Sequence, residues 1–85
     1  MRLDKFLKVS RIIKRRTIAN QACDNEKIVV NNKIAKASLN LKIGDVIKIR
    51  FNNKVLSIEV LSLNEVVGKK NASSMYKIIA EENNG

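Results

Sequence analysis

The 85-residue sequence contains no histidine, a single cysteine (Cys23), and three glycines that stand apart from one another. Without histidine, the lone thiol lacks the base that usually activates a cysteine nucleophile. A zinc site would need several cysteine or histidine ligands, and a phosphate-binding loop would need clustered glycines. The acidic residues are scattered along the chain. We therefore predict no catalytic residue, no metal site and no cofactor, and we interpret Cys23 as a small core residue.

Two further absences concern the environment of the protein. A single cysteine cannot form an internal disulfide, which fits a reducing compartment. No apolar run approaches the roughly 18 residues of a membrane-spanning helix, and no signal-peptide core is evident. The sequence therefore predicts a cytoplasmic protein.

Aromatic residues are also scarce, since the chain has only Phe6, Phe51 and Tyr76. The core of this one small domain must then consist mostly of isoleucine, leucine and valine. Proteins that bind single-stranded nucleic acids stack bases on several aromatic rings. Three aromatics, at least one of them in the core, make such a platform improbable.

Positive charge is abundant: 17 lysines and arginines face 8 acidic residues, for a net charge of +9. Residues 1–54 carry 14 basic and 4 acidic groups, whereas residues 55–85 carry 3 and 4. Such a balance favours a polyanionic partner, with nucleic acid ahead of an anionic membrane surface. The basic function is thus expected in the first two-thirds of the chain.

Residues 1–16 hold seven of the basic residues but interleave them with apolar ones. At about 3.6 residues per turn, a helix over residues 3–9 places Leu3, Phe6 and Leu7 on one face and the cations on the other. The only acid, Asp4, is expected either to pair with Lys8 or to cap this helix. The stretch is therefore interpreted as a folded basic surface.

A second helix is predicted from about Lys14 to Asp24, with a stop at Asn25 in the left-handed conformation. Its apolar stripe would comprise Ile18, Ala19, Ala22 and Cys23. Lys14, Arg15 and Arg16 would occupy its first turn, where cations oppose the helix dipole. Three in succession favour a phosphate docked at that end.

The rest of the chain has the period of β-strands. Strands are expected at 27–30, 33–35, 45–51, 54–63 and 75–79, with turns at Asn31-Asn32, Gly44 and Asn52-Asn53 and a loop over 64–74. Residues 80–85 are expected to be a frayed tail. The predicted fold is α+β: one domain over residues 1–85, its core motif at about 2–63, with two or three short N-terminal helices packed on a small, mostly antiparallel sheet.

The favoured ligand is folded RNA, recognised by shape and phosphate contacts. DNA stays open, because Arg15, Arg16, Thr17 and Asn20 would lie early in the second helix, where a DNA-reading helix carries polar side chains.

The order and spacing of several motifs resemble the S-four RNA-binding domain, a helix–helix–strand module named for a ribosomal protein. The matching residues are Arg2-Leu3-Asp4-Lys5, Arg16, Ala19, Ile28-Val29-Val30-Asn31 and Lys42-Ile43-Gly44-Asp45-Val46-Ile47. The chain departs from the family where Glu26 and Asn32 replace the usual glycines and Ile43 replaces a common proline.

The whole chain further resembles the stand-alone bacterial ribosome quality control P factors, through Met1–Arg11, Ile13–Thr17, Ala35–Ser38 and Met75-Tyr76. This resemblance implies binding to 23S rRNA and P-site tRNA on large ribosomal subunits obstructed by peptidyl-tRNA. It also implies support for template-free alanine tailing by a partner elongation factor. The related heat-shock recycling factors are usually longer with a basic tail, and the short acidic tail here argues against that type.

We expect RNA contacts from the helical basic residues and from the first β-turn: Arg2, Lys5, Lys8, Arg11, Lys14, Arg15, Arg16, Asn32, Lys33 and Lys36. Arg2 and Arg16 stand first, because they match recurring family positions; Lys69 and Lys70 are weaker candidates. The free protein is expected to be a monomer that does not bind membranes. A general rRNA-binding or ribosome-assembly protein remains an alternative, and a membrane-surface peptide a distant third.

Overall fold

The computed structural model describes residues 1–64, 72 and 74–83. These residues form helices α1 (Leu3–Val9) and α2 (Arg16–Asp24) and strands β1 (Ile28–Val30), β2 (Lys33–Ile34), β3 (Val46–Arg50), β4 (Lys54–Val60) and β5 (Tyr76–Asn83). The strands make one sheet in the order β2-β1-β3-β4-β5, and every neighbouring pair is antiparallel. The α+β class is confirmed, with two α-helices in the described part of the chain.

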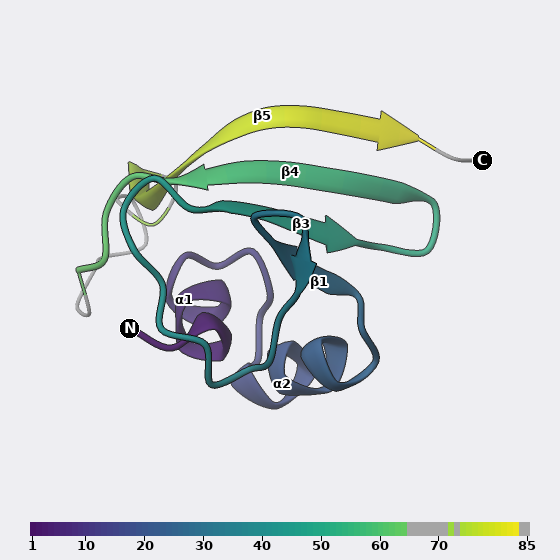
Figure 1. Cartoon of the computed structure of the whole chain (residues 1–85), viewed down its shortest axis with the longest axis horizontal. Coiled ribbons are helices and arrows are strands. Elements are labelled where there is room, and N and C mark those ends of the chain that lie inside the picture. Colours follow the sequence, from purple (N-terminus) through teal and green to yellow (C-terminus); the bar gives the residue numbers. More distant parts are fainter. Residues whose placement is uncertain (65–71, 73, 84–85) are drawn as a thin grey trace.

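Both helices lie on the same side of the sheet, and the core fills the space between these two layers (Figure 1). Leu3, Phe6 and Leu7 are fully buried there, which confirms the predicted apolar face of α1. Alternation in β3 places Ile47 and Ile49 against the helices. The opposite face of α1 is thereby held at the surface in a fixed orientation.

The second helix begins later than the sequence predicted. Arg15 is its N-cap residue and Arg16 its first helical residue, so Lys14 and Arg15 lie outside the first turn. The expectation of three cations in the first turn of α2 was therefore wrong, because of these three only Arg16 lies in that turn. Ile18 is 48% exposed, whereas Ala19 and Cys23 are buried. The predicted stripe is thus wrong for Ile18, which lies beside a hollow of about 300 Å³ shared with β3.

The end of α2 is set by a glutamate in the left-handed conformation. Glu26 has φ 60°, whereas Asn25 has φ −90°, so the expected stop at Asn25 is corrected by one residue. The amide of Glu26 donates to the carbonyl of Cys23 at 3.0 Å, and that of Lys27 donates to Ala22 at 2.9 Å. These two bonds form a Schellman motif, whose left-handed position usually holds glycine.

Replacing Glu26 with glycine is expected to stabilise the protein. The Cβ of a left-handed L-residue crowds the following carbonyl at about 1–2 kcal/mol, and the greater unfolded-state entropy of glycine offsets part of that gain. We expect E26G to raise the free energy of unfolding in urea by about 0.5 kcal/mol. E26A keeps the Cβ and serves as the control; equal stability of both variants would contradict the assignment.

The turns of the sheet follow the predicted pattern. Asn31 and Asn32 have φ 50° and 69°, as a two-residue hairpin turn between β1 and β2 requires. Asn31 also ties this turn to β3: its side-chain amide donates to Asp45 at 3.1 Å, and its side-chain oxygen accepts the amide of Val46 at 3.0 Å. Gly44 has φ 95° in the turn that precedes β3. The hairpin is therefore fixed relative to the sheet.

The last strand is longer than predicted. β5 pairs with β4 from Tyr76 opposite Val60 to Asn83 opposite Lys54, so the frayed tail expected over 80–85 is wrong for residues 80–83. An ion pair of 3.0 Å between Lys54 and Glu81 reinforces this pairing. β4, predicted to reach residue 63, ends at Val60. Residues 65–71, 73 and 84–85, including Lys69 and Lys70 of the predicted loop, lie outside the described residues.

Candidate nucleic-acid interface

The candidate site is organised around Asp4, a buried acid in the first turn of α1. Its side chain is 3% exposed, and one carboxylate oxygen accepts the backbone amide of Lys5 at 2.8 Å. The preceding helix amides are satisfied from another segment, because Leu3 donates to Leu39 at 2.8 Å and Asp4 to Ala37 at 3.1 Å. Asp4 thus satisfies a first-turn amide of α1, as the expected capping role requires, although the N-cap residue is Arg2, whose side chain makes no capping bond.

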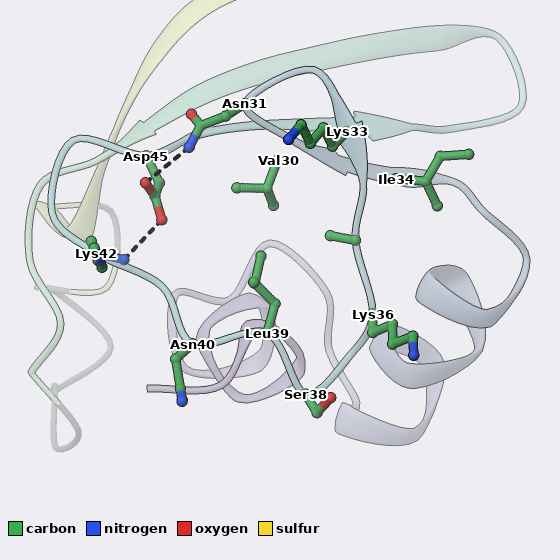
Figure 2. A pocket seen from close by; sticks show the side chains of 11 residues that line it. Val30, Asn31, Lys33, Ile34, Lys36, Ser38, Leu39, Asn40, Lys42 and Asp45 are labelled. Atoms are coloured by element: carbon green, nitrogen blue, oxygen red, sulfur yellow. Dashed lines mark hydrogen bonds between the residues drawn. The ribbon is translucent and has the colours of Figure 1, made fainter.

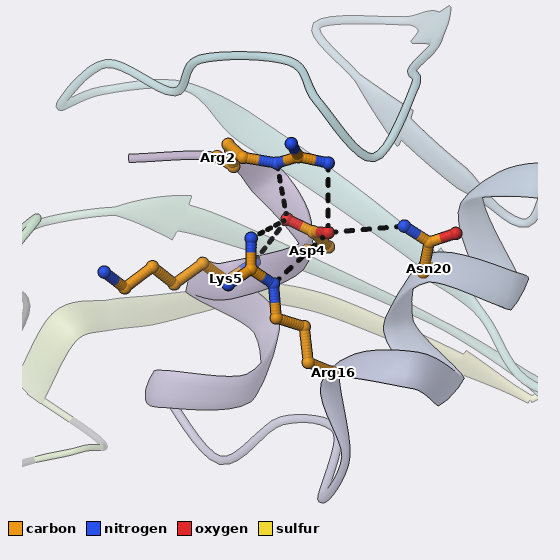
Figure 3. A network of polar contacts seen from close by, with 5 residues as sticks. All are labelled: Arg2, Asp4, Lys5, Arg16 and Asn20. Atoms are coloured by element: carbon orange, nitrogen blue, oxygen red, sulfur yellow. Dashed lines mark hydrogen bonds and ion pairs between the residues drawn. The ribbon is translucent and has the colours of Figure 1, made fainter.

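Three side chains converge on the Asp4 carboxylate (Figure 3). From the N-cap of α1, Arg2 Nε lies 3.2 Å from Oδ1. From the first turn of α2, Arg16 Nε lies 3.4 Å from Oδ2, and Asn20 donates to Oδ2 at 3.3 Å. We call these four residues the Asp4 network. The ion pairs of Asp4 therefore go to Arg2 and Arg16, and not to Lys8 as one alternative expected.

The network keeps Asp4 ionised and leaves both guanidinium groups accessible. Burial raises the pKa of the Asp4 carboxyl, but hydrogen bonds from Arg16, Asn20, Arg2 and the Lys5 backbone outweigh burial and lower that pKa below its ordinary value. The side chains of Arg2 and Arg16 are 47% and 49% exposed. Two arginines against one carboxylate leave a net charge of +1, with donors free to turn toward a phosphate.

The other basic residues predicted to contact RNA from the helical region lie between Arg2 and Arg16 in sequence. Lys5 and Lys8 belong to α1, and Arg11, Lys14 and Arg15 lie in the connection to α2. All except the partly buried Lys5 are exposed. Arg11 has φ 63° and its amide donates to the carbonyl of Lys8 at 3.0 Å, which ends α1 and turns the chain. The structure brings Arg2 and Arg16 together on the carboxylate of Asp4.

The predicted β-turn residues lie beside a second feature, a hollow of about 620 Å³ between the β1–β2 hairpin and residues 35–42 (Figure 2). Lys33 and Lys36 line this hairpin hollow, whereas Asn32 lies in the turn next to it. Lys42 also lines it and was missed, although it belongs to the recognised Lys42–Asp45 motif. Asn20 was named only as a possible DNA-reading residue, and its contact with Asp4 was missed, although its spacing of four residues from Arg16 places both on one helix face.

Cys23 lies on the buried face of α2 and is not a reactive thiol. Burial raises its pKa to about 11, and the negative charges of Asp4 and Asp24 add to the shift. At neutral pH only about one thiol in 10⁴ is ionised at such a pKa, and the thiolate is the nucleophile.

Alkylation should therefore distinguish native from unfolded protein. We expect iodoacetamide at pH 7.5 to leave Cys23 of the folded protein unmodified. Over the same time it should fully label the protein unfolded in 6 M guanidinium, a denaturant roughly twice as effective as urea. Mass spectrometry measures the added carbamidomethyl group. Rapid labelling of the folded chain would contradict the burial of Cys23.

Within residues 1–64, 72 and 74–83, no group of three histidine, cysteine, aspartate or glutamate side chains is arranged to hold a metal ion. Over the same part of the chain, no helix has the length and apolarity needed to cross a membrane.

The S4 domain family model matches residues 1–47, which include both helices and the hairpin. The chain is 52% identical over 81 residues to the RQC P-site tRNA stabilizing factor of Streptococcus pneumoniae, covering 95% of this chain and 92% of that protein. It is 47% identical over 85 residues to the protein of the same name from Bacillus subtilis, covering 100% and 99%.

The trimeric structure of Heat Shock Protein 15 from Vibrio cholerae has a TM-score of 0.85 to this fold at 28% identity. The likeness covers 94% of this chain and 82% of that one. The sequence resemblance to the S-four domain is thereby confirmed, and Glu26, where that family usually has glycine, does have a positive φ. The chain belongs to the S4 domain family and, at 47% to 52% identity over nearly its full length, to the family of RQC P-site tRNA stabilizing factors.

Proposed function

We propose that this protein is an RNA-binding adaptor that stabilises P-site tRNA on the large ribosomal subunit during ribosome-associated quality control. The Asp4 network is the observation that carries the proposal. It holds two half-exposed arginines from two helices on one buried carboxylate. The names of relatives that are 47% to 52% identical support the same role.

Recognition by this surface would be electrostatic and geometric. Guanidinium groups bind phosphate oxygens through two parallel hydrogen bonds, and arginines already held in place lose less entropy on binding. Arg2 and Arg16 would contact one RNA backbone, with further contacts from Lys5, Lys8, Arg11, Lys14 and Arg15. Asn32, Lys33 and Lys36 of the hairpin side would contact a second backbone. No bond is made or broken, so the protein would act by position and not as an enzyme.

At finer detail, the two RNAs would be 23S rRNA and the tRNA of a large subunit obstructed by peptidyl-tRNA. Holding them together would let a partner elongation factor add alanines to the stalled chain without a small subunit or message. The protein would work in the cytoplasm and be monomeric when free.

Co-sedimentation tests this function directly. Purified large subunits carrying peptidyl-tRNA are expected to retain the protein, whereas vacant large subunits should retain several-fold less. The second candidate is a heat-shock-type recycling factor or a general rRNA-binding protein, which the TM-score of 0.85 to Heat Shock Protein 15 favours. A general rRNA-binding protein would sediment equally with vacant and obstructed subunits, and that result would remove the tRNA-specific role.

The salt dependence of RNA binding should report the number of phosphate contacts. With about five to seven contacts, log K against log salt should fall with a slope of roughly −4 to −6. Fluorescence anisotropy with a labelled tRNA between 50 and 200 mM KCl, a range where the effect is large, measures it. A slope near zero would contradict phosphate-dominated recognition by the basic surface.

A further inference from the structure

The hairpin hollow has a chemical character different from the Asp4 network. Its floor is apolar, formed by Val30, Ala35 and Leu39, and Figure 2 shows Leu39 and Val30 pointing toward each other across it. Leu39 remains 37% exposed and Ile34 at the edge 62% exposed. An accessible apolar floor of this kind suits the flat face of an uncharged ring or an aliphatic group.

The rim of the hollow is basic. Lys33, Lys36 and Lys42 come from three of its sides: the hairpin, the segment after β2, and the turn before β3. The acid at this rim, Asp45, already accepts hydrogen bonds from the side chain of Asn31 at 3.1 Å and the amide of Lys42 at 2.8 Å. The rim therefore presents positive charge around an apolar floor, which complements a group that carries phosphate next to an uncharged ring.

One segment that lines the hollow is paired through its backbone with the segment that carries Arg2. Arg2 forms an antiparallel bridge with Asn40, and the amide of Leu3 donates to the carbonyl of Leu39 at 2.8 Å. The residue that supplies the floor thus lies against the segment that presents Arg2. The second RNA backbone proposed for the hairpin side would therefore pass beside the segment that carries Arg2.

We propose that the hairpin hollow binds one unpaired nucleotide of the RNA, with its base against Leu39 and Val30 and its phosphates near Lys33, Lys36 and Lys42. This inference rests on the proposed RNA-binding function and adds a base-dependent contact to it. Aliphatic side chains contact bases less favourably than aromatic rings do, so the contribution should be at the lower end of base–protein stacking effects, about fivefold in affinity.

Three RNA hairpins of one sequence test the proposal: one with a single unpaired adenosine, one with an abasic ribose at that position, and one fully paired. The abasic RNA keeps the phosphate and removes only the base. The wild-type protein should bind the adenosine RNA about fivefold more tightly than the other two. Leu39→Ser should bind all three equally, and Ile34→Ser, at a more exposed edge position, should reduce the preference without endangering the fold.

The control is Ile43→Ser, since Ile43 is 68% exposed and does not line the hollow; it should keep the fivefold preference. Equal binding of the adenosine and abasic RNAs by the wild type, with a normal salt slope, would overturn this inference and leave the proposed function standing. A salt slope near zero for all three would instead overturn the proposed function. Binding of a peptide with leucine between glutamates, lost in Leu39→Ser, would show a protein ligand and also overturn the inference.

Discussion

Replacing Arg16 with glutamine is expected to weaken RNA binding about tenfold, and replacing Arg2 and Arg16 together about a hundredfold. A hydrogen bond to a charged partner contributes about 1.5–3 kcal/mol, and each lost phosphate contact should make the log K against log salt slope less negative by about one. Anisotropy titrations with labelled tRNA at several salt concentrations measure both quantities. The same variants should sediment poorly with obstructed large subunits.

Glutamine is the informative substitution because of the Asp4 network. Charge reversal at Arg16 would be a less clear test of RNA contact. The structure shows Arg16 Nε 3.4 Å from the buried carboxylate of Asp4, so a glutamate there would bring two carboxylates together. Loss of binding by R16E would then have two causes, whereas glutamine can still donate to Asp4.

The matched control is Arg50→Gln, which removes one arginine charge from the exposed end of β3, outside the Asp4 network. If charge alone determined affinity, R50Q and R16Q would weaken binding equally. We expect R50Q to change affinity less than twofold, because long-range charge effects are screened over about 10 Å at 0.1 M salt. Equal losses of RNA affinity in R50Q and R16Q would contradict the assignment of Arg16 as an RNA-binding residue.

The sequence predicted the fold well where a periodic pattern and a specific turn agreed. The spacing of Leu3, Phe6 and Leu7 fixes one face of α1, and Asn31-Asn32 fixes the register of β1 with β2. Helix boundaries were less predictable, because Glu26 takes a left-handed conformation that its residue type disfavours, in the Schellman motif that ends α2. Likewise, Lys54 and Glu81 lie far apart in sequence, so their pairing gave no local sign that β5 reaches Asn83.

The candidate site shows the same division. A basic surface on two helices follows from charge and periodicity, since both are local properties. The role of Asp4 does not, because its partners Arg16 and Asn20 lie 12 and 16 residues away. Local rules offered Lys8, one helical turn along, as the alternative to a capping role. Lys42 was passed over because the backbone bridge between Arg2 and Asn40, which brings its segment beside α1, is a tertiary contact.

Asp4→Asn is expected to lower the free energy of unfolding by about 2 kcal/mol at pH 7. Asparagine keeps the shape but loses the charge that accepts hydrogen bonds from two arginines, and hydrogen bonds to charged groups contribute about 1.5–3 kcal/mol. The value lies toward the lower end because both arginines are half exposed and can rehydrate. Urea unfolding measures it. Asp24→Asn, at the exposed end of α2, is the control and should change stability by less than about 0.5 kcal/mol.

The effect of Asp4→Asn should depend on pH in a defined direction. The network lowers the pKa of Asp4 below its ordinary value in the folded protein, so the unfolded state binds more protons between the folded and unfolded pKa values. The stability that ionised Asp4 contributes to the folded protein is therefore complete above about pH 5 and is lost as the pH falls through the folded pKa. The stability difference between wild type and D4N should shrink below pH 4. A difference that stays constant down to pH 2.5 would contradict an ionised Asp4.

RNA affinity of the same variant separates charge from position. Asp4→Asn raises the net charge by one, so a purely electrostatic surface would bind RNA more tightly and with a steeper salt slope. The alternative is that the carboxylate is needed to hold Arg2 and Arg16 in a phosphate-binding arrangement. In that case the variant must order both side chains when RNA binds, which costs side-chain entropy. We expect the second effect to win, with affinity falling about threefold to tenfold at 150 mM salt, where screening weakens the added charge. The buried acid would then be a positioning residue for an otherwise basic surface.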